Sequence, residues 1–594
     1  MPEPKSKTPR QIVEDTLSIH RTQALWTTNY FPALPFTPQI FQIGALLPAM
    51  LYMARFGHRR GKGKFVATFG AQASVADVAR TLLARSESTL AGFESATGPT
   101  VLGDLLLAGC LENRAHALGQ QEPVLRVFPS HYLASWLDLP VNVVNLRGVP
   151  EFLTALLANQ AKGEWLETGI LRGRFPVGVG FSENVLLELF GQAMKISGPY
   201  AANLASDEFD EHVAQDIGVE ELLAVRLAQA CGSAPLKARG KDETERIPNR
   251  HPLAHQAAEF LREDLAIFIE VYGTSVPRQA FLQMLEAGIA LGLTNLLLST
   301  ASVMEIWEQN GHVSDVQSPL PLFVDCSNGQ DRALRDLAEN SMVECVRRYE
   351  RLPVRMMLLR VLDNSASDDE DLKRELPSSF PNSIDRINFL GGIYQARHPE
   401  SAFLLRDLKK DCQKLADALE DQSPEVATRL RQSEVSPALR LAEALCELMG
   451  DNLQRQNFMK TLESALLTDQ PNGLAIKRRA QRTIQNGAKQ QMDQRAIVLQ
   501  APMLDFLVHR YLRKAAKGKP RKPLSLQTFL RLLRERYGLY IDQEPPGQPI
   551  SQTLLLDNKA KLERRLRDLG LLIGVNDAES MKQLQPRYLG AKDV

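Results

Sequence analysis

Three short stretches of the sequence hold residue types that could do chemistry. In RHPLAHQAAEF, His251, His255 and Glu259 are spaced four residues apart and would share one face of a helix, as zinc ligands do. The zinc-protease pattern requires a glutamate directly after the first histidine, and Pro252 stands there instead. Proline is favoured in the first turn of a helix, so we interpret this stretch as a helix start with His251 at the cap. We expect no metal site.

The other two stretches are a glycine loop and a strand end. GHRRGKGKF (57–65) has the wrong glycine spacing for a nucleotide-binding loop and lacks the following Ser or Thr, so we interpret it as an exposed basic turn. In FVDCSNGQD (323–331), Cys326 and Ser327 have no general base nearby in sequence, and Asp331 is a natural helix cap. We therefore expect no catalytic residue and no cofactor. A nuclease built from dispersed acids remains an alternative.

The strongest signal is a local excess of positive charge near the C-terminus. Residues 471–540 contain 16 Lys and Arg against three Asp and Glu, a balance of +13 in a chain whose 70 basic and 70 acidic residues cancel. Such a basic body is typical of contacts with nucleic-acid phosphates. The residues expected to bind nucleic acid, duplex DNA in particular, are Lys477, Arg478, Arg479, Arg482, Lys517, Lys519, Arg521, Lys522, Lys561, Arg564, Arg565 and Arg567.

Two helices and a hairpin are expected to position the last of these cations. Leu526, Phe529, Leu530, Leu533 and Tyr537 form one apolar stripe, with Ser525 as the N-cap. A second helix is expected over 551–569, with Leu562, Leu566 and Leu569 facing inward, Lys561, Arg564 and Arg567 opposite, and Arg565 on the flank. Gly570 should end this helix, and the runs LLIGV and MKQLQPRYL around NDAES predict a hairpin.

This order of helix, helix and hairpin resembles the winged helix-turn-helix fold over about residues 500–590. The resemblance implies that the helix at 551–569 enters the major groove of DNA and that the hairpin touches the backbone. Winged helices also make protein contacts, so both uses stay open. The whole chain, a helical body with a basic tail, resembles non-catalytic components of bacterial anti-phage defence systems of the methylation-associated type. That resemblance implies a role in handling foreign DNA beside separate enzyme subunits.

The fold class expected for the 594 residues is mainly α and multidomain, with an α/β N-terminal part, a helical middle and a C-terminal winged-helix-like domain. Strand-like runs FVATF, VNVVNL and FPVGVGF alternate with helical segments in the N-terminal part, including 149–159 and 182–194. The expected layout is a mixed α/β domain at 1–235, a linker at 236–251, a helical domain with a short strand at 252–362, an acidic linker at 363–375, a helical domain at 376–470, a basic helical connector at 471–524 and the winged-helix-like domain at 525–594.

Composition predicts a soluble cytoplasmic protein. Six widely scattered cysteines suit reduced, buried thiols, and the N-terminal residues lack the apolar core of a signal peptide. The apolar stretch Ile40–Met53 is shorter than the ~20 residues that span a bilayer, so we expect a core helix and no membrane contact. The expected function is a non-enzymatic nucleic-acid-binding subunit of a larger bacterial assembly. The alternative is a protein-interaction scaffold or adaptor that docks a partner, another protein subunit, through its basic C-terminal module.

Overall fold

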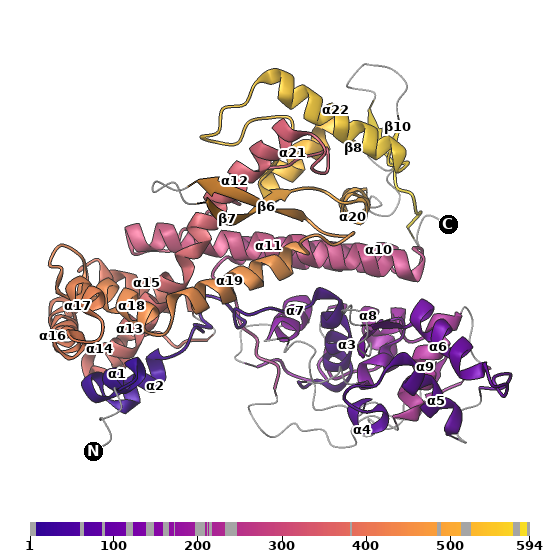
Figure 1. Cartoon of the computed structure of the whole chain (residues 1–594), viewed down its shortest axis with the longest axis horizontal. Coiled ribbons are helices and arrows are strands. Elements are labelled where there is room, and N and C mark those ends of the chain that lie inside the picture. The colour runs from indigo at the N-terminus through magenta and orange to yellow at the C-terminus, as the bar shows by residue number, and fades with distance from the viewer. Residues whose placement is uncertain are drawn as a thin grey trace. The chain divides into compact units, whose positions relative to one another are not determined.

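The structure, a computed structural model, is mainly α-helical and divides into two compact units (Figure 1). Unit 1 contains residues 1–40, 250–264 and 284–587, and unit 2 contains residues 41–249, 265–283 and 588–594. The residues that the structure describes are 7–59, 65–85, 90–113, 123–137, 146, 148–158, 165–171, 173–195, 208–210, 212, 217–231, 246–380, 383–483, 489–512, 524–573 and 582–590.

Two long helices, α10 (His255–Tyr272) and α11 (Arg278–Asn310), contribute residues to both units. Within the described part of the chain, α11 alone is long and apolar enough to cross a membrane by length and composition. Its most apolar 18-residue window is 94% buried inside the protein. The apolar segment Ile40–Met53 contains most of α3 (Leu46–Phe56), whose residues are all buried, and this confirms that it is a core helix.

Unit 1 begins with a helical layer formed by segments far apart in sequence. Its helices are α1 (Pro9–Leu17), α2 (Ile19–Leu25), α12 (Arg332–Glu350), α13 (Leu352–Asp368), α14 (Glu370–Glu375), α15 (Ser383–Tyr394), α16 (Ser401–Leu419), α17 (Pro424–Arg431), α18 (Pro437–Leu448) and α19 (Asp451–Leu466). On α16 the buried residues Leu404, Leu408, Leu415 and Leu419 recur at helical spacing, which gives the helix one apolar face. Helices α1, α17 and α18 pack against α16.

Apart from α10 and α11, the rest of the described part of unit 1 mixes short strands with three helices. Its elements are β5 (Leu322–Phe323), β6 (Ala475–Thr483), β7 (Lys489–Ile497), α20 (Ala501–Tyr511), β8 (Leu524–Ser525), α21 (Leu526–Tyr537), β9 (Leu539–Tyr540), α22 (Gln552–Asp568), β10 (Leu572–Ile573) and β11 (Gln583–Leu584). The strands form a parallel pair β5–β9, an antiparallel hairpin β6–β7 and a three-stranded antiparallel sheet in the order β10–β11–β8.

One small core holds these pieces together. Phe323 of β5, Leu334 of α12, Ala496 of β7 and Leu555 of α22 are buried in the same cluster. Ile476 of β6 packs against it while partly exposed. The root of the β6–β7 hairpin and the first half of α22 are therefore fixed to the same helix, α12.

In its described residues, unit 2 contains short helices and two small antiparallel strand pairs. Its elements are the 3₁₀ turns Ile43–Ala45, Tyr132–Trp136 and Phe181–Glu183, with α3, α4 (Phe65–Phe69), α5 (Val75–Ala84), α6 (Gly98–Gly109), β1 (Leu111–Asn113), β2 (Val124–Val127), α7 (Val149–Ala158), α8 (Val185–Leu189), β3 (Met194–Lys195), β4 (Glu208–Phe209) and α9 (Val219–Ala230). Val78, Leu82, Leu102, Leu106 and Leu227 lie in one apolar cluster of this unit.

The expected α/β alternation in the N-terminal part is wrong where the structure describes it. FVATF is helix α4, because its two phenylalanines, four residues apart, are both buried on one face with ring centroids 4.9 Å apart. Residues 175–181 contain no strand, and 141–145 lie outside the described residues. The described strands of unit 2, β1 to β4, instead form antiparallel pairs.

Three other expectations about the layout also need correction. The first 40 residues lie in unit 1 and not with the rest of the N-terminal part. The proposed acidic linker 363–375 is helical, because α13 continues to Asp368 and the Asp369 side chain caps α14 by accepting from the amides of Asp371 and Leu372. The connector 471–524 is not wholly helical, since it contains the β6–β7 hairpin before α20. Of the linker 236–251, residues 236–245 lie outside the described part.

Several local predictions are confirmed. Asp331 caps α12, Ser525 caps α21, and Gly570 follows α22 with a left-handed φ of 69°. All six cysteines are buried thiols. One helix start differs from the prediction. The helix expected to begin at Pro252 begins at His255, so α10 starts three residues later.

Candidate nucleic-acid interface

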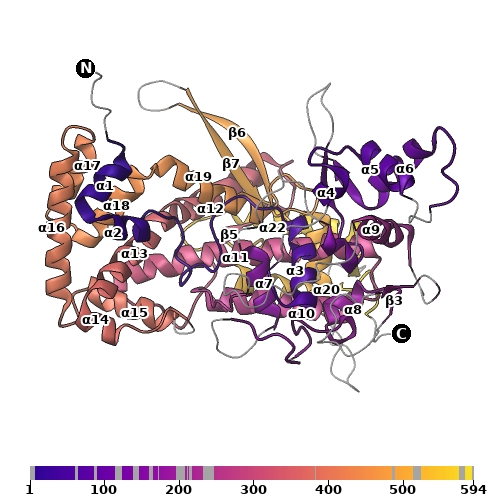
Figure 2. The ribbon, with the colours of Figure 1, turned by 90° about the horizontal axis from the view of Figure 1, so that it is seen from below.

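The β6–β7 hairpin carries the first group of predicted contact residues. Its two nine-residue strands pair in unbroken register from Ala475–Ile497 to Thr483–Lys489. Figure 2 shows them as a twisted two-stranded ribbon that extends away from α12 and α19. Since side chains alternate between the two faces of a strand, every second residue of β6 points the same way.

The cations at the root of the hairpin are engaged inside unit 1. Arg478 donates to both carboxylate oxygens of the buried Glu339 on α12, each at 2.5 Å, and this hydrogen bonding raises the pKa of Arg478. Arg495 donates to Glu463 of α19 at 3.0 Å, and the ammonium of Lys477 lies 3.6 Å from the same carboxylate. These pairs anchor the ribbon, so Lys477 and Arg478 have a structural role in holding it.

The outer part of the ribbon presents a different surface. Arg479, Gln481 and Gln491 are exposed, and Arg479 forms no ion pair with the residues that the structure describes. Arg482 lies farther out on β6, and its side chain is outside the described part. Lys517, Lys519, Arg521 and Lys522 also lie outside the described residues.

Helix α22 carries the last group of predicted contacts, and its inner face is occupied. Lys561 pairs with Asp331 at 3.0 Å and with Asp557, and Arg565 donates to the backbone carbonyls of Cys326 and Leu499. Burial lowers the pKa of Arg565. These two cations hold α22 against the segment after β5, so the prediction that Lys561 lies on the outer side of the helix is wrong.

A buried asparagine completes this attachment. Asn558 accepts from the amide of Cys326 at 2.9 Å and donates to the carbonyls of Val324 and Ile541 at 2.9 and 3.0 Å. Leu562 and Leu566 are fully buried, as expected for the inward face. The orientation of α22 is therefore fixed by both apolar and polar contacts.

The outer face of α22 is polar and cationic. The side chain of Arg564 is 84% exposed, with Asp568 3.9 Å away, and that of Arg567 is 45% exposed, with Glu563 3.5 Å away. Gln552 and Thr553, in the first turn, are exposed as well. The pair of Arg564 with Asp568 is exposed on both sides and contributes little to stability, so the guanidinium group of Arg564 is available to an anionic ligand. The partner of Arg567, Glu563, is buried and also pairs with Lys582 at 2.9 Å, and the outer part of the Arg567 side chain remains accessible.

In the stretch after β5, one buried carboxylate holds a side chain and backbone amides of the next residues. The carboxylate of Asp325 accepts from the Ser327 hydroxyl at 2.5 Å and from the amides of Ser327 and Gly329, each at 2.7 Å, which makes a closed turn. Burial raises the pKa of the Cys326 thiol to about 12. The thiol is therefore protonated at neutral pH, and no described histidine contacts it.

The other two sequence candidates are the stretch from His251 to Glu259 and the glycine loop 57–65. No group of His, Cys, Asp or Glu in the described residues is arranged to hold a metal ion, and His255 begins α10. Of the glycine loop, residues 60–64 lie outside the described part, and Arg59 pairs with Glu151 at 3.1 Å.

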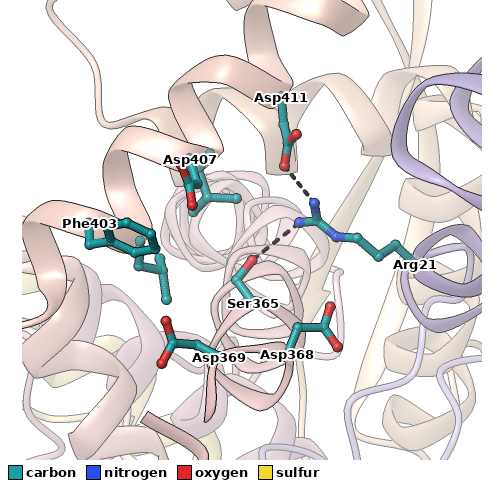
Figure 3. Close-up of a pocket in the computed structure, with 9 residues that line it drawn as sticks. Arg21, Ser365, Asp368, Asp369, Phe403, Asp407 and Asp411 are labelled. Carbon is teal, nitrogen blue, oxygen red and sulfur yellow. Dashed lines mark hydrogen bonds and ion pairs between the residues drawn. The ribbon is translucent and has the colours of Figure 1, made fainter. Parts of the chain in front are cut away.

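An acidic hollow of about 230 Å³ lies elsewhere in unit 1, between α13, α14 and α16 (Figure 3). Four aspartates line it: Asp368, Asp369, Asp407 and Asp411. Arg21 of α2 enters the hollow, where it donates to Asp411 at 2.5 Å and to Ser365 at 3.3 Å. Sequence reasoning missed this cluster, although the spacing of Asp407 and Asp411 places both on one face of a helix. Its negative charge does not suit a phosphate backbone.

The family comparison matches residues 189–588 of the chain to the methylation-associated defense system protein MAD7. This range covers about two thirds of the 594 residues. The chain belongs to the MAD7 family. The MAD7 match includes the β6–β7 hairpin and α22, and it makes the protein a component of a methylation-associated defence system. The chain matches no curated protein and no solved structure.

Two kinds of surface residue on the candidate interface were not predicted from the sequence. Gln481 and Gln491 were not predicted because a helix was expected over this segment. A helix has no cross-strand residue pairs, so nothing indicated that these two side chains lie side by side. Gln552 and Thr553 were overlooked because only charge was counted. KRRAQRT and KQQMDQR are polar at nearly every position, so neither shows the apolar–polar alternation that would have predicted a half-buried strand.

Proposed function

We propose that this MAD7-family protein is a non-enzymatic subunit of its defence system that binds duplex DNA through the C-terminal part of unit 1. The observation that carries the proposal is the outer face of α22, where Arg564 is exposed with only an exposed carboxylate 3.9 Å away and Arg567 is half-exposed beside it. Its inner face is fixed by Asn558, Lys561 and Arg565. A helix held in this way can present cations to phosphates without rearranging.

The order of elements supports a winged-helix-like C-terminal domain. Strand β8, helices α21 and α22 and strands β10 and β11 follow one another, and β11 pairs with both β10 and β8. Strand β9 lies between the two helices and pairs with β5, outside this sheet. In winged-helix proteins that bind DNA, the position of α22 is that of the helix that enters the major groove.

The first prediction concerns this helix. Replacing both Arg564 and Arg567 with Ala in the full-length chain should weaken binding to a 30-base-pair duplex by roughly tenfold or more, because each charge-assisted hydrogen bond is worth about 1.5–3 kcal/mol. The slope of log affinity against log salt concentration is negative, and its magnitude should decrease by about two. The reason is that each phosphate no longer contacted by the protein keeps about one counterion that the wild type would release. Fluorescence anisotropy at several salt concentrations measures both quantities.

The matched control is Arg347→Ala with Arg374→Ala. These arginines are 74% and 73% exposed and pair with helical neighbours, as Arg564 and Arg567 do, but they lie on α12 and α14. The control should bind DNA as the wild type does. Undiminished affinity in the α22 variant would contradict the proposal.

A second candidate function is a protein-docking adaptor, which the exposure of Leu556 favours. This leucine is 64% exposed on the same face of α22 as the arginines. Co-expression with the other proteins of the defence cluster, using the wild type and Leu556→Gln, tests it. Loss of co-purification without loss of DNA affinity would assign α22 to a protein partner.

An assay of duplex cleavage with and without Mg²⁺ or Mn²⁺ tests the remaining alternative, a nuclease.

A further inference from the structure

The outer part of the β6–β7 hairpin has an unusual composition for an exposed ribbon. Strands β6 and β7 contain a single acidic residue, Asp493, and its carboxylate lies 3.7 Å from the ammonium of Lys477. Five cross-strand pairs extend from Arg479–Asp493 outward to Thr483–Lys489. Beyond Asp493 the strands carry no negative charge to oppose an approaching phosphate.

One face of this outer part gathers the residue types that read bases. Arg479 and Gln481 are two residues apart on β6, and Gln491 is the cross-strand partner of Gln481, so the three side chains share a face with Asp493, the cross-strand partner of Arg479. All three are exposed. Arginine makes bidentate hydrogen bonds to guanine in the major groove, and glutamine does so to adenine.

The dimensions of the ribbon fit that groove. Neighbouring strands lie about 4.8 Å apart, and four residue steps span about 14 Å along the ribbon. The major groove of B-form DNA is about 12 Å wide and about 8.5 Å deep, which admits a two-stranded ribbon. The ion pairs of Arg478 with Glu339 and of Arg495 with Glu463 fix the root of the ribbon to α12 and α19, so its direction is set before binding.

We propose that the outer part of the β6–β7 hairpin enters the major groove of duplex DNA, where Arg479, Gln481 and Gln491 contact base edges. The ribbon thus adds sequence readout to the affinity that α22 supplies, and this inference rests on the proposed DNA-binding function. The excess of positive charge in the sequence predicts phosphate contacts for this region, whereas the ribbon geometry favours base contacts.

The experiment compares the full-length wild type with the variant Arg479→Ala, Gln481→Ala, Gln491→Ala. Each protein selects duplexes from a pool with a randomised core, and the bound sequences are counted. The wild type should enrich a preferred sequence, and the variant should lose that enrichment. Its affinity for the enriched duplex should fall roughly tenfold or more, because each bidentate base contact discriminates by that order, while its affinity for unselected duplex changes much less.

A second measurement tests the groove itself. Replacing guanine with 7-deazaguanine in the enriched duplex removes the N7 acceptor from the major groove. The substitution should weaken binding of the wild type and have no further effect on the triple variant. Equal weakening of both proteins would overturn the assignment of Arg479 to guanine.

The controls separate the possible failures. The variant Lys409→Ala, Gln413→Ala, Gln422→Ala removes one cation and two amides from other exposed positions of unit 1 and should behave as the wild type, and melting curves show whether each variant is folded. If the triple ribbon variant keeps its sequence preference, or loses affinity equally for all duplexes, the ribbon inference fails although α22 still binds DNA. If the wild type binds only heparin or an acidic peptide and no duplex, the proposed function fails as well.

Discussion

His131 in unit 2 shows how one buried side chain makes stability depend on pH. The residue is fully buried at the start of a 3₁₀ turn. Its Nε2 atom donates to the carbonyl of Gln192 at 2.8 Å, and its Nδ1 atom accepts from the amide of Leu133 at 3.2 Å. Protonation of Nδ1 would remove that acceptor, and burial lowers the pKa of His131 to about 4.

This low pKa predicts a loss of stability in mild acid. Histidine in the unfolded chain has a pKa of about 6.5, so between pH 6.5 and 4 the unfolded state binds the proton and the folded state does not. The contribution of His131 to stability, of the order of 3 kcal/mol, is complete above pH 6.5 and is lost as the pH falls toward 4. His131→Asn keeps an acceptor for Leu133 and does not titrate. Unfolding midpoints measured from pH 7.5 to 4 should decline less in the variant, and parallel curves would contradict the assignment.

Some cations of the C-terminal region are bound to other parts of unit 1, and others are exposed to solvent. The sequence alone could not separate these two groups. Charge counting correctly located a basic body, because that property is local. It could not separate Arg478, which is bound to Glu339, from Arg479, which is exposed, although the two are neighbours. The partner lies 139 residues away in sequence. The same holds for Arg565, whose acceptors are backbone carbonyls of other segments.

At the scale of elements, the crossing of α15 over the end of α11 depends on two glycines. Gly311 follows α11 with a left-handed φ of 66°, and Gly391 of α15 lies directly against it. A Cβ atom built on Gly391 would lie 2.0 Å from the carbonyl oxygen of Gly311. Trp307 of α11 donates to the carbonyl of Ile387 at 2.9 Å and fixes the same crossing. Only a residue without a side chain fits at position 391.

Adjacent glycines provide a matched test of this crossing. Gly391→Ala should destabilise the protein by about 2 kcal/mol or more, because backbone must move to admit the methyl group. Gly392→Ala meets no atom within 4 Å and should stabilise α15 by up to about 1 kcal/mol, since alanine is the better helix former. Denaturant unfolding of the two variants measures the difference, and equal effects would show that α15 can shift on α11.

Elements whose signals are local were predictable, and those that depend on distant pairing were not. Asp331, Ser525 and Gly570 mark helix ends by their own side-chain chemistry or φ preference, and each was predicted correctly. The β6–β7 hairpin was missed because its root is held by Glu339 and Glu463, which lie on α12 and α19. The reverse error occurred at FVATF, where β-branched and aromatic residues predicted a strand but two phenylalanines pack on one side of a helix.

At the scale of the whole molecule, the chain does not fold as consecutive segments. Residues 1–40 belong to unit 1, together with residues that lie more than 240 positions later. Contacts between residues so far apart leave no pattern in a single sequence. The N-terminal domain expected to end at residue 235 therefore included residues 1–40, which belong to unit 1. The N-terminal segment is bound by Tyr30, which donates to Asp363 at 2.9 Å, and by Arg21, which donates to Asp411.

The buried Arg360 of α13 is the centre of this attachment. Its guanidinium group donates to three backbone carbonyls of the N-terminal segment, those of Leu25 at 3.1 Å, of Asn29 at 2.7 Å and of Thr27. Burial lowers the pKa of Arg360 to about 10, which leaves the group protonated at neutral pH. The segment after α2 has no regular structure of its own, so these hydrogen bonds supply partners that its carbonyls would otherwise lack.

Replacing Arg360 with Met should therefore loosen the N-terminal segment. The side-chain volume is nearly retained, but three backbone carbonyls lose their donor, at a cost of about 1–3 kcal/mol for each that water cannot reach. Limited trypsin digestion should cut the variant faster than the wild type at Arg10 and Arg21, with fragments identified by mass spectrometry. Arg397→Met, at an exposed position after α15, is the control and should leave both rates unchanged. If Arg360→Met is cut no faster than the wild type, the apolar contacts of α1 with α16 are sufficient to hold the segment in place.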